Sequence, residues 1–170
     1  MGDPSIYPTD TTSVRTRPLA VAVAACLAFL VLGGIAGGGA EPEGWYAELV
    51  RPDFPVPALL FLLMGAAYYV LVGIVLYRAQ VHVPAGGPRR FAVGLTLAVL
   101  AVNELWNVVF LELRSLTAGV AGTGTVFLLL GALSALVARH DRTSFWVLLP
   151  YLAWSLFDLV WSVELLRLNS

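Results

Sequence analysis

The sequence predicts an all-α integral membrane protein, built as a bundle of five transmembrane helices. Of its 170 residues, 59% are hydrophobic and only 12% are charged, and the mean hydropathy is +0.83. The chain also holds five long apolar runs, each close to the roughly 20 residues that a helix needs to cross a bilayer. A soluble domain of this size could not bury so much apolar surface, so lipid must be its main solvent.

The five runs fall at residues 19–39, 57–77, 91–111, 116–137 and 145–166. The short segments between them hold most of the arginines and half of the prolines. A polar tail, residues 1–18, precedes a first run that is too long for a cleaved secretory signal. We therefore expect residues 19–170 to form one five-helix membrane domain.

The basic residues predict how the bundle is oriented. The tail and the second and fourth connections should share one side of the membrane, and they hold seven arginines: Arg15, Arg17, Arg78, Arg89, Arg90, Arg139 and Arg142. The other side should hold three: Arg51, Arg114 and Arg167. Positive flanks are retained in the cytoplasm, so we expect a multi-pass cell-membrane protein with a cytoplasmic amino terminus and an external carboxyl terminus. The net charge of −1 gives no basic footprint for nucleic acid.

The first run and the connections carry no pattern for a metal site. Cys26 is the single cysteine, so it forms no internal disulfide and is expected to be a buried thiol. His82 and His140 lie in connections, where solvated side chains are usual. We expect no metal ligands in the chain.

The connection after the first run is long and rich in proline and aromatic residues. Pro52 and Pro57 cannot continue a helix, whereas Trp45, Tyr46 and Phe54 suit a membrane interface. Composition leaves two interpretations open, an interfacial aromatic belt and a lid over a binding cavity.

The third run carries Asn103, Glu104 and Asn107 within five residues. On a helix, the spacing of three or four residues puts Asn103, Trp106, Asn107 and Phe110 on one face. Polar side chains avoid lipid, so this face should turn toward protein or a water-filled cavity. Alternatively, the amides only join helices through interhelical hydrogen bonds.

Asp158 in the fifth run lies about 13 residues from the start of its run, as Glu104 does in the third, so the two carboxyls should have similar depth in parallel helices. Two ionised carboxylates there would be costly, so one should be protonated near neutral pH if they are neighbours. Alternatively, Glu104 points elsewhere and Asp158 bonds to an indole or a tyrosine hydroxyl.

Glycines in the helices predict close packing. Gly119 and Gly122 form no phosphate loop, because no strand precedes them and no lysine follows. Small residues at four-residue spacing around Gly33, Gly34 and Gly131 suggest faces for a homodimer.

Four segments of the chain resemble one known family. WYAELVRPDFPVP, residues 45–57, resembles the first-loop signature of the translocator protein family, also called TspO/MBR, tryptophan-rich sensory proteins or peripheral-type benzodiazepine receptors. AVNELWNVVF, residues 101–110, is similar to its third-helix motif, and MGAAYYVLVGIVLYR, residues 64–78, is similar to its second helix. PYLAW, residues 150–154, and the ending Arg167, Leu168 and Asn169 resemble its last helix.

The resemblance implies a cavity that binds tetrapyrroles such as protoporphyrin or haem, lined by the first loop and by helices one, two, three and five. Flat conjugated ligands stack on aromatic side chains, and a few polar groups orient them. The motifs and the shared face of the third helix nominate these ligand-binding residues: Trp45, Tyr46, Arg51, Pro52, Pro57, Tyr68, Asn103, Trp106, Asn107, Phe110, Tyr151, Trp154 and Asp158.

The chain also departs from the family pattern. Asp53 stands where the loop usually has tryptophan, Val108 where the third helix has proline, and Asp158 where a small residue faces the ligand. The sterol-recognition pattern is not met around any tyrosine, so sterol is the least supported ligand.

These observations predict a non-enzymatic receptor, sensor or carrier for a flat hydrophobic ligand, with no cofactor required beyond a bound tetrapyrrole. The alternatives are light-dependent porphyrin degradation, for which Trp106 and Trp154 could supply an electron-rich ring, and a small proton-coupled exporter that uses the intramembrane carboxyls. We identify no catalytic residue in the sequence and expect a binding protein rather than an enzyme.

Overall fold

The structure, a computed structural model, describes residues 15–37, 44–54 and 57–170. Its five long helices are α1 (Thr16–Gly37), α2 (Ala58–His82), α3 (Gly87–Leu113), α4 (Leu116–His140) and α5 (Arg142–Leu168), with the short 3-10 helix η1 (Trp45–Glu48) between the first two. All five are long and apolar enough to cross a membrane. The predicted fold class, an all-α bundle of five membrane-spanning helices, is confirmed.

The helices extend beyond the apolar runs from which they were predicted. α1 begins at Thr16 rather than Leu19, and α2 continues past Tyr77 to His82. Hydropathy marks only the part of a helix that lies in hydrocarbon, whereas the backbone hydrogen bonds continue through flanking polar residues. Residues 1–14 of the expected tail and 38–39 of the expected first helix lie outside the described residues.

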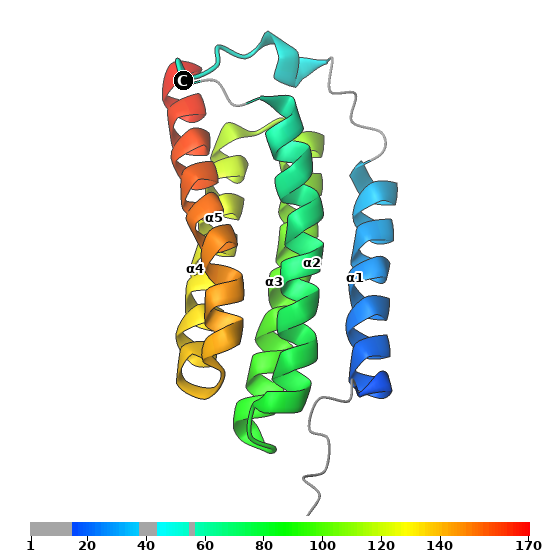
Figure 1. Cartoon of the computed structure of the whole chain (residues 1–170). Coiled ribbons are helices and arrows are strands. Elements are labelled where there is room, and N and C mark those ends of the chain that lie inside the picture. Colours follow the sequence, from blue (N-terminus) through cyan, green and yellow to red (C-terminus); the bar gives the residue numbers. More distant parts are fainter. Residues whose placement is uncertain (1–14, 38–43, 55–56) are drawn as a thin grey trace, which may run out of the picture.

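The helices alternate in direction, so that α1, α3 and α5 run one way and α2 and α4 the other (Figure 1). α1 packs against α2 and α3 at one edge of the bundle, while α4 packs against α3 and α5. α5 in turn packs against α2, which joins the two sides. The first connection, with η1, passes over the end of the bundle where α5 ends (Figure 1).

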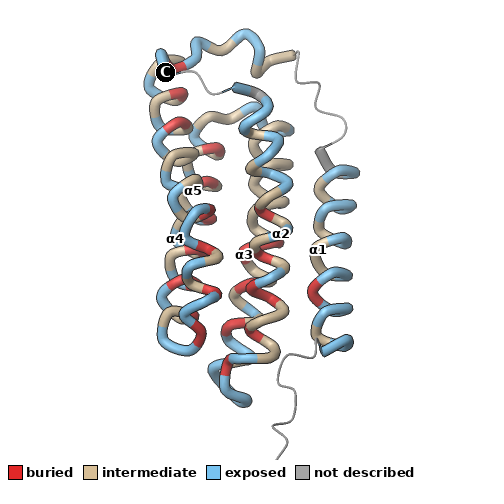
Figure 2. Tube along the Cα trace, viewed as in Figure 1, coloured by how far each residue is buried: buried red, intermediate tan, exposed pale blue. Residues whose placement is uncertain are grey.

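One half of the bundle is tightly packed. All four buried residues of α3 lie in its first half, where Val99 and Leu100 meet Val72 of α2 and Leu133 of α4. Figure 2 shows the same bias, because the buried segments of α2 and α3 gather toward the end where those two helices are joined. We call this the packed half. Aliphatic side chains from four helices fill it, and it anchors the bundle.

An ion pair fastens the end of the packed half. Arg78 of α2 donates to both oxygens of Asp141, from Nε at 2.8 Å and from Nη2 at 2.7 Å. Ser144 of α5 donates to the same carboxylate at 2.6 Å. Burial favours the neutral form of Asp141, but the hydrogen bonds from Arg78 and Ser144 outweigh it, so the pKa of Asp141 lies below its usual value.

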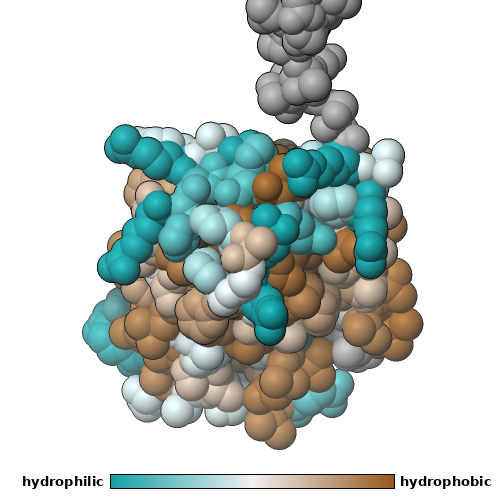
Figure 3. Space-filling model, turned by 90° about the horizontal axis from the view of Figure 1, so that it is seen from below, coloured by the Kyte–Doolittle hydropathy of each residue, from teal (hydrophilic) through white to brown (hydrophobic). Residues whose placement is uncertain are grey.

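The outer surface is apolar around the bundle and polar at its ends. Large side chains such as Leu62, Phe91 and Leu128 are more than 60% exposed, as lipid-facing residues are. Viewed from the end where α2 joins α3 and α4 joins α5, hydrophilic side chains gather over part of the face, and apolar side chains occupy much of the rest (Figure 3). Arg90, Arg139 and Arg142 are exposed at these two junctions.

Candidate functional site: a cavity under the first connection

The opposite half of the bundle encloses a cavity of about 320 Å³. We call this the hollow half. Nine of its eighteen lining residues are aromatic: Tyr46, Phe61, Tyr68, Tyr69, Trp106, Phe110, Tyr151, Trp154 and Trp161. The remainder include a small polar group, Asn103, Glu104, Asn107, Asp158 and Ser162. α4 adds Leu116 and Gly119, whereas α1, which the resemblance included, contributes none of the described lining residues.

The polar face predicted on α3 turns into this cavity. Asn103, Trp106, Asn107 and Phe110 all line it. Asn107 donates to the backbone carbonyl of Asn103 at 2.7 Å, and Asn103 donates to Glu104 at 3.3 Å, so among the described residues neither amide bonds to another helix. The alternative that these amides only join helices therefore finds no support in the described contacts.

Two glycines of α4 make room for the aromatic side chains of α3. A Cβ atom at Gly122 would lie 2.5 Å from Cβ of Trp106, and one at Gly119 would lie 2.8 Å from the ring of Phe110. Real Cβ atoms do not approach so closely, so only glycine allows α4 to lie against these rings. The close packing predicted for Gly119 and Gly122 is observed, and its partner is the aromatic wall of the cavity.

α2 and α5 supply the opposite walls. Tyr68 is buried, stacks on Tyr151 with ring centroids 4.9 Å apart, and donates its hydroxyl to the carbonyl of Val99 at 3.1 Å. Trp154 meets Phe61 edge to face at 5.4 Å. Aromatic pairs prefer offset and edge-to-face arrangements, so these contacts favour the observed orientation of the rings in both walls.

Glu104 turns partly away from the cavity centre. Its Oε1 accepts a hydrogen bond of 2.5 Å from the hydroxyl of Tyr69, and its Oε2 occupies the space beside Gly33 of α1 where any larger residue would need its Cβ. Glu104 and Asp158 line the same cavity, as their similar depth suggests. No hydrogen bond joins the two carboxyls among the described residues, and Gly33 packs against Glu104 of the same chain.

Only some of the first-connection residues that were expected to bind the ligand reach the cavity. Tyr46 lines the cavity, while Trp45 reaches it indirectly through an edge-to-face contact with Phe110 at 5.5 Å. Arg51 lies over the ring of Tyr46, 5.8 Å from its centroid. Pro52 is buried and Pro57 is exposed at the start of α2, and neither lines the cavity.

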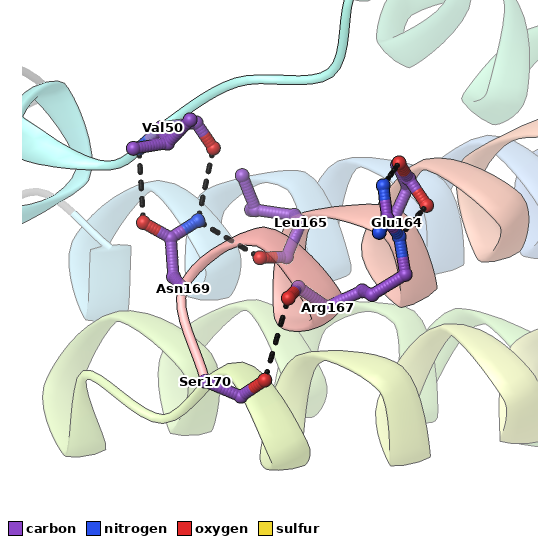
Figure 4. Close-up of polar contacts among 6 residues, drawn as sticks. All are labelled: Val50, Glu164, Leu165, Arg167, Asn169 and Ser170. Atoms are coloured by element: carbon purple, nitrogen blue, oxygen red, sulfur yellow. Dashed lines mark hydrogen bonds and ion pairs between the residues drawn. The ribbon is translucent and has the colours of Figure 1, made fainter.

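Asn169 ties this connection to the end of α5 (Figure 4). Its Oδ1 accepts from the backbone N–H of Val50 and its Nδ2 donates to the carbonyl of Val50, both at 2.9 Å. The same Nδ2 donates to the carbonyl of Leu165, also at 2.9 Å. One amide side chain thus satisfies both backbone groups of Val50, as a neighbouring β-strand would, and holds the connection against α5.

Sequence reasoning missed several lining residues. Phe61, Gly65 and Tyr69 follow each other at four residues on α2 and could have been found from that spacing, as Trp161 could from Asp158 and Trp154. The role of Tyr69 as a donor to Glu104 had no sequence signal, because it depends on the rotation of two helices. Among the described residues, no three His, Cys, Asp or Glu side chains gather as a metal site.

Comparison with known proteins agrees with this geometry. Residues 22–167 match the TspO/MBR family. The chain belongs to the TspO/MBR family. A tryptophan-rich protein TspO of Archaeoglobus fulgidus is 31% identical over 151 residues, covering 87% of this chain and 96% of the relative. A tryptophan-rich sensory protein of Cereibacter sphaeroides is 26% identical over 129 residues, covering 76% and 79%. The family recognised from four short motifs is confirmed, and the match includes all five helices.

Proposed function

We propose that this TspO/MBR membrane protein is a binding protein, a receptor, sensor or carrier, for a flat conjugated hydrophobic molecule. Tetrapyrroles such as protoporphyrin or haem are the ligands that the family resemblance favours. One observation carries the proposal: a cavity with half of its lining residues aromatic and a few polar groups set among them. Rings stack on such walls, and the polar groups fix orientation.

The size of the cavity limits how a tetrapyrrole enters it. Its volume of about 320 Å³ lies near the lower end of the roughly 300 to 1,000 Å³ typical of ligand pockets. A macrocycle therefore requires a neighbouring segment to move aside. The candidates are the first connection, which covers one end, and α1, which contributes no described lining residue.

Substitution of Trp154 tests the proposal. Trp154→Ala should weaken protoporphyrin binding by about 1 to 3 kcal/mol, because a large stacking surface is lost. Trp146→Ala is the matched control on the same helix, since Trp146 is 61% exposed and lies outside the cavity. Affinity is measured in detergent or nanodiscs by absorbance. Equal affinities of wild type and Trp154→Ala would contradict the proposed site.

Asp158 should set the charge preference of the cavity. It lines the cavity and makes no hydrogen bond among the described residues, so its carboxyl is available to a ligand. A protonated carboxyl donates to a ligand carboxylate, whereas an ionised one repels it. Binding of an anionic tetrapyrrole should weaken as pH rises, and Asp158→Ala should remove much of that dependence after subtraction of the ligand's own titration. Identical pH profiles would make the role of Asp158 structural.

Light-dependent porphyrin degradation is a second candidate, supported by the position of two electron-rich rings. Trp106 and Trp154 both line the cavity, where they would lie beside a bound macrocycle. Illumination of the complex distinguishes the candidates, because binding alone shifts the absorption band whereas degradation produces a new pigment. The exporter alternative depends on Glu104 and Asp158 and requires substrate flux across sealed vesicles.

The orientation and assembly of the protein are further proposals. The arginine-rich end, with Arg90, Arg139 and Arg142 exposed, should face the cytoplasm. Gly34 and Gly131 have open space around their Cα atoms within the single chain, so they remain the small faces suited to a homodimer. Protease accessibility in oriented vesicles and crosslinking in native membranes test these two points.

A further inference from the structure

Tyr69 forms a wall between two separate spaces. On one side it lines the aromatic cavity. On the other it lines a groove of about 350 Å³ between α1 and α2, on the outer surface of the bundle. The groove is apolar, with Val23, Cys26 and Leu27 on the α1 side and Val70, Gly73 and Ile74 on the α2 side. The side chain of Tyr69 thus stands between lipid and the cavity.

The helix on the far side of this groove is the least attached in the bundle. Only 6% of the apolar stretch of α1 is buried, against 17% for α3, the next lowest. Figure 2 shows α1 exposed or intermediate along nearly its whole length, and Ala22 is its single buried residue among those described. Lipid is as apolar as the groove, so α1 can separate from α2 without exposing apolar surface to water.

Several contacts close the seam between α1 and α2. Cys26 of α1 donates to the backbone carbonyl of Tyr69 at 3.5 Å, and Gln80 of α2 donates to the carbonyl of Pro18 at 3.3 Å. One carboxyl of α3 reaches both helices. Glu104 of α3 accepts the hydroxyl of Tyr69 through Oε1 at 2.5 Å, and its Oε2 lies against Gly33 of α1. Glu104 therefore contacts α1 and α2 at the same point and holds the ring of Tyr69 across the gap. The alternative route, under the first connection, is closed by a different set of contacts, including the two hydrogen bonds between Asn169 and Val50.

We propose that the seam between α1 and α2 is a lateral entrance, through which a flat hydrophobic ligand dissolved in the bilayer reaches the cavity, and that Tyr69 is the side chain that closes it. The proposal rests on the proposed function of the cavity. The apolar groove takes the ligand from lipid, α1 moves outward, and Tyr69 swings away from Glu104. The ligand never has to pass the polar first connection.

The chain offers a direct means to lock this seam. A Cβ atom at Gly73 would lie 3.1 Å from Sγ of Cys26. In a disulfide, the Cβ atom of one cysteine lies about 3 Å from the sulfur of the other, as follows from the S–S bond length and angles. Gly73→Cys should therefore form a disulfide with the native Cys26, which is the only cysteine of the chain. That bond ties α1 to α2 across the groove.

The experiment measures protoporphyrin uptake and release by the full-length Gly73→Cys protein in nanodiscs, oxidised and then reduced. In the oxidised protein, uptake and release of the ligand should both be at least about tenfold slower, because the disulfide keeps α1 from moving away from α2. Its Kd should be unchanged, since neither sulfur lines the cavity, and reduction should restore both rates. Gly73→Ala and the double variant Cys26→Ser with Gly73→Cys are the controls, in which oxidant should have no effect.

The outcomes separate the two proposals. Equal rates in the oxidised and reduced protein, with the disulfide verified on a non-reducing gel, would overturn the lateral entrance and leave the proposed function standing. Failure of the reduced protein to bind protoporphyrin would overturn the proposed function and the entrance with it.

Tyr69→Phe provides a second, independent variant. It keeps the ring but removes the hydrogen bond to Glu104, so uptake and release should both become several-fold faster. A variant that folds normally and shows wild-type rates would contradict the role of Tyr69 as the gate.

Discussion

The packed half and the hollow half are built from the same four helices, α2 to α5, yet one is solid and the other encloses a cavity. In the packed half, Val99 and Leu100 of α3 meet other aliphatic side chains that interdigitate. Later in the same helix, Trp106 and Phe110 stand against glycines of α4 and against each other, with ring centroids 5.8 Å apart. Aliphatic side chains pack the first region closely, whereas in the second the large rings contact one another and border the cavity. The residue types along each helix thus decide where the bundle is solid.

Truncation in the packed half should have the largest effect on stability. Leu133→Ala removes a fully buried side chain of α4. Because lipid is as apolar as the core, the loss is mainly of packing, and we expect the lower part of the usual range, about 2 to 3 kcal/mol. Unfolding in detergent measures it. Leu128→Ala on the same helix, where the residue is 70% exposed, is the control, and a similar loss in both variants would contradict the distinction between packed and lipid-facing positions.

A methyl group at Gly122 should damage the hollow half by overpacking. Gly122→Ala places a Cβ atom 2.5 Å from Cβ of Trp106, which cannot move without shifting α3. We expect a loss of about 1 to 3 kcal/mol of stability, together with weaker ligand binding. Gly131→Ala is the matched control, because a Cβ atom there meets nothing within 4 Å. If the two alanine variants behave alike, the aromatic wall does not depend on this close approach.

Loss of the ion pair at the end of the packed half should have a smaller effect on stability, and this effect should depend on pH. Asp141→Asn leaves Arg78, whose side chain is 22% exposed, without its charged partner, at a cost of about 1 to 2 kcal/mol at pH 7. The pKa of Asp141 is lowered in the folded protein, so its contribution is complete above about pH 4 and is lost as pH falls through the lower folded value. Wild type should therefore lose stability in acid more steeply than the variant.

Unfolding in detergent from pH 7 to pH 3 measures this difference. Glu164→Gln serves as the control, because the ion pair of Glu164 with Arg167 lies at the exposed end of α5 and should contribute nothing measurable. Parallel pH curves for wild type and Asp141→Asn would show that the carboxylate is not stabilised by folding.

The smallest effect should come from loss of the hydrogen bonds that attach the first connection to the end of α5. Asn169→Ala removes the hydrogen bonds to both backbone groups of Val50, so the first connection should loosen and open a second path beside the lateral entrance. Ligand release should rise a few-fold, by the roughly 1 kcal/mol of a partly exposed hydrogen-bond pair, with little change in unfolding. Asn169→Asp keeps the acceptor and should have an intermediate effect. Ser170→Ala is the control, since its hydroxyl donates to the backbone carbonyl of Arg167 and, among the described residues, has no hydrogen bond to the first connection (Figure 4). Unchanged release in Asn169→Ala would mean that the connection is no lid.

The comparison between the halves also explains which site residues could be predicted. The face of α3 with Asn103, Trp106 and Phe110 follows from helical spacing alone, and it lines the cavity as expected. Tyr69 and Trp161 also line it and were missed, although their spacing from Phe61 and from Trp154 and Asp158 would have indicated them. Pro52 and Pro57 belong to the matched loop motif but lie outside the cavity lining.

By itself the sequence determined that lipid surrounds the protein, how many helices it forms and which face of α3 is polar. Each of these depends on residues that are near one another in the chain. Apolar runs of membrane length must form helices, since unpaired backbone groups are too costly in lipid. Only the tertiary structure decided that Glu104 bonds to Tyr69 and fills the space beside Gly33, and that Asn169 holds Val50. Those contacts join residues far apart in the chain, and the rotation and depth of each helix, set by packing against its neighbours, bring them together.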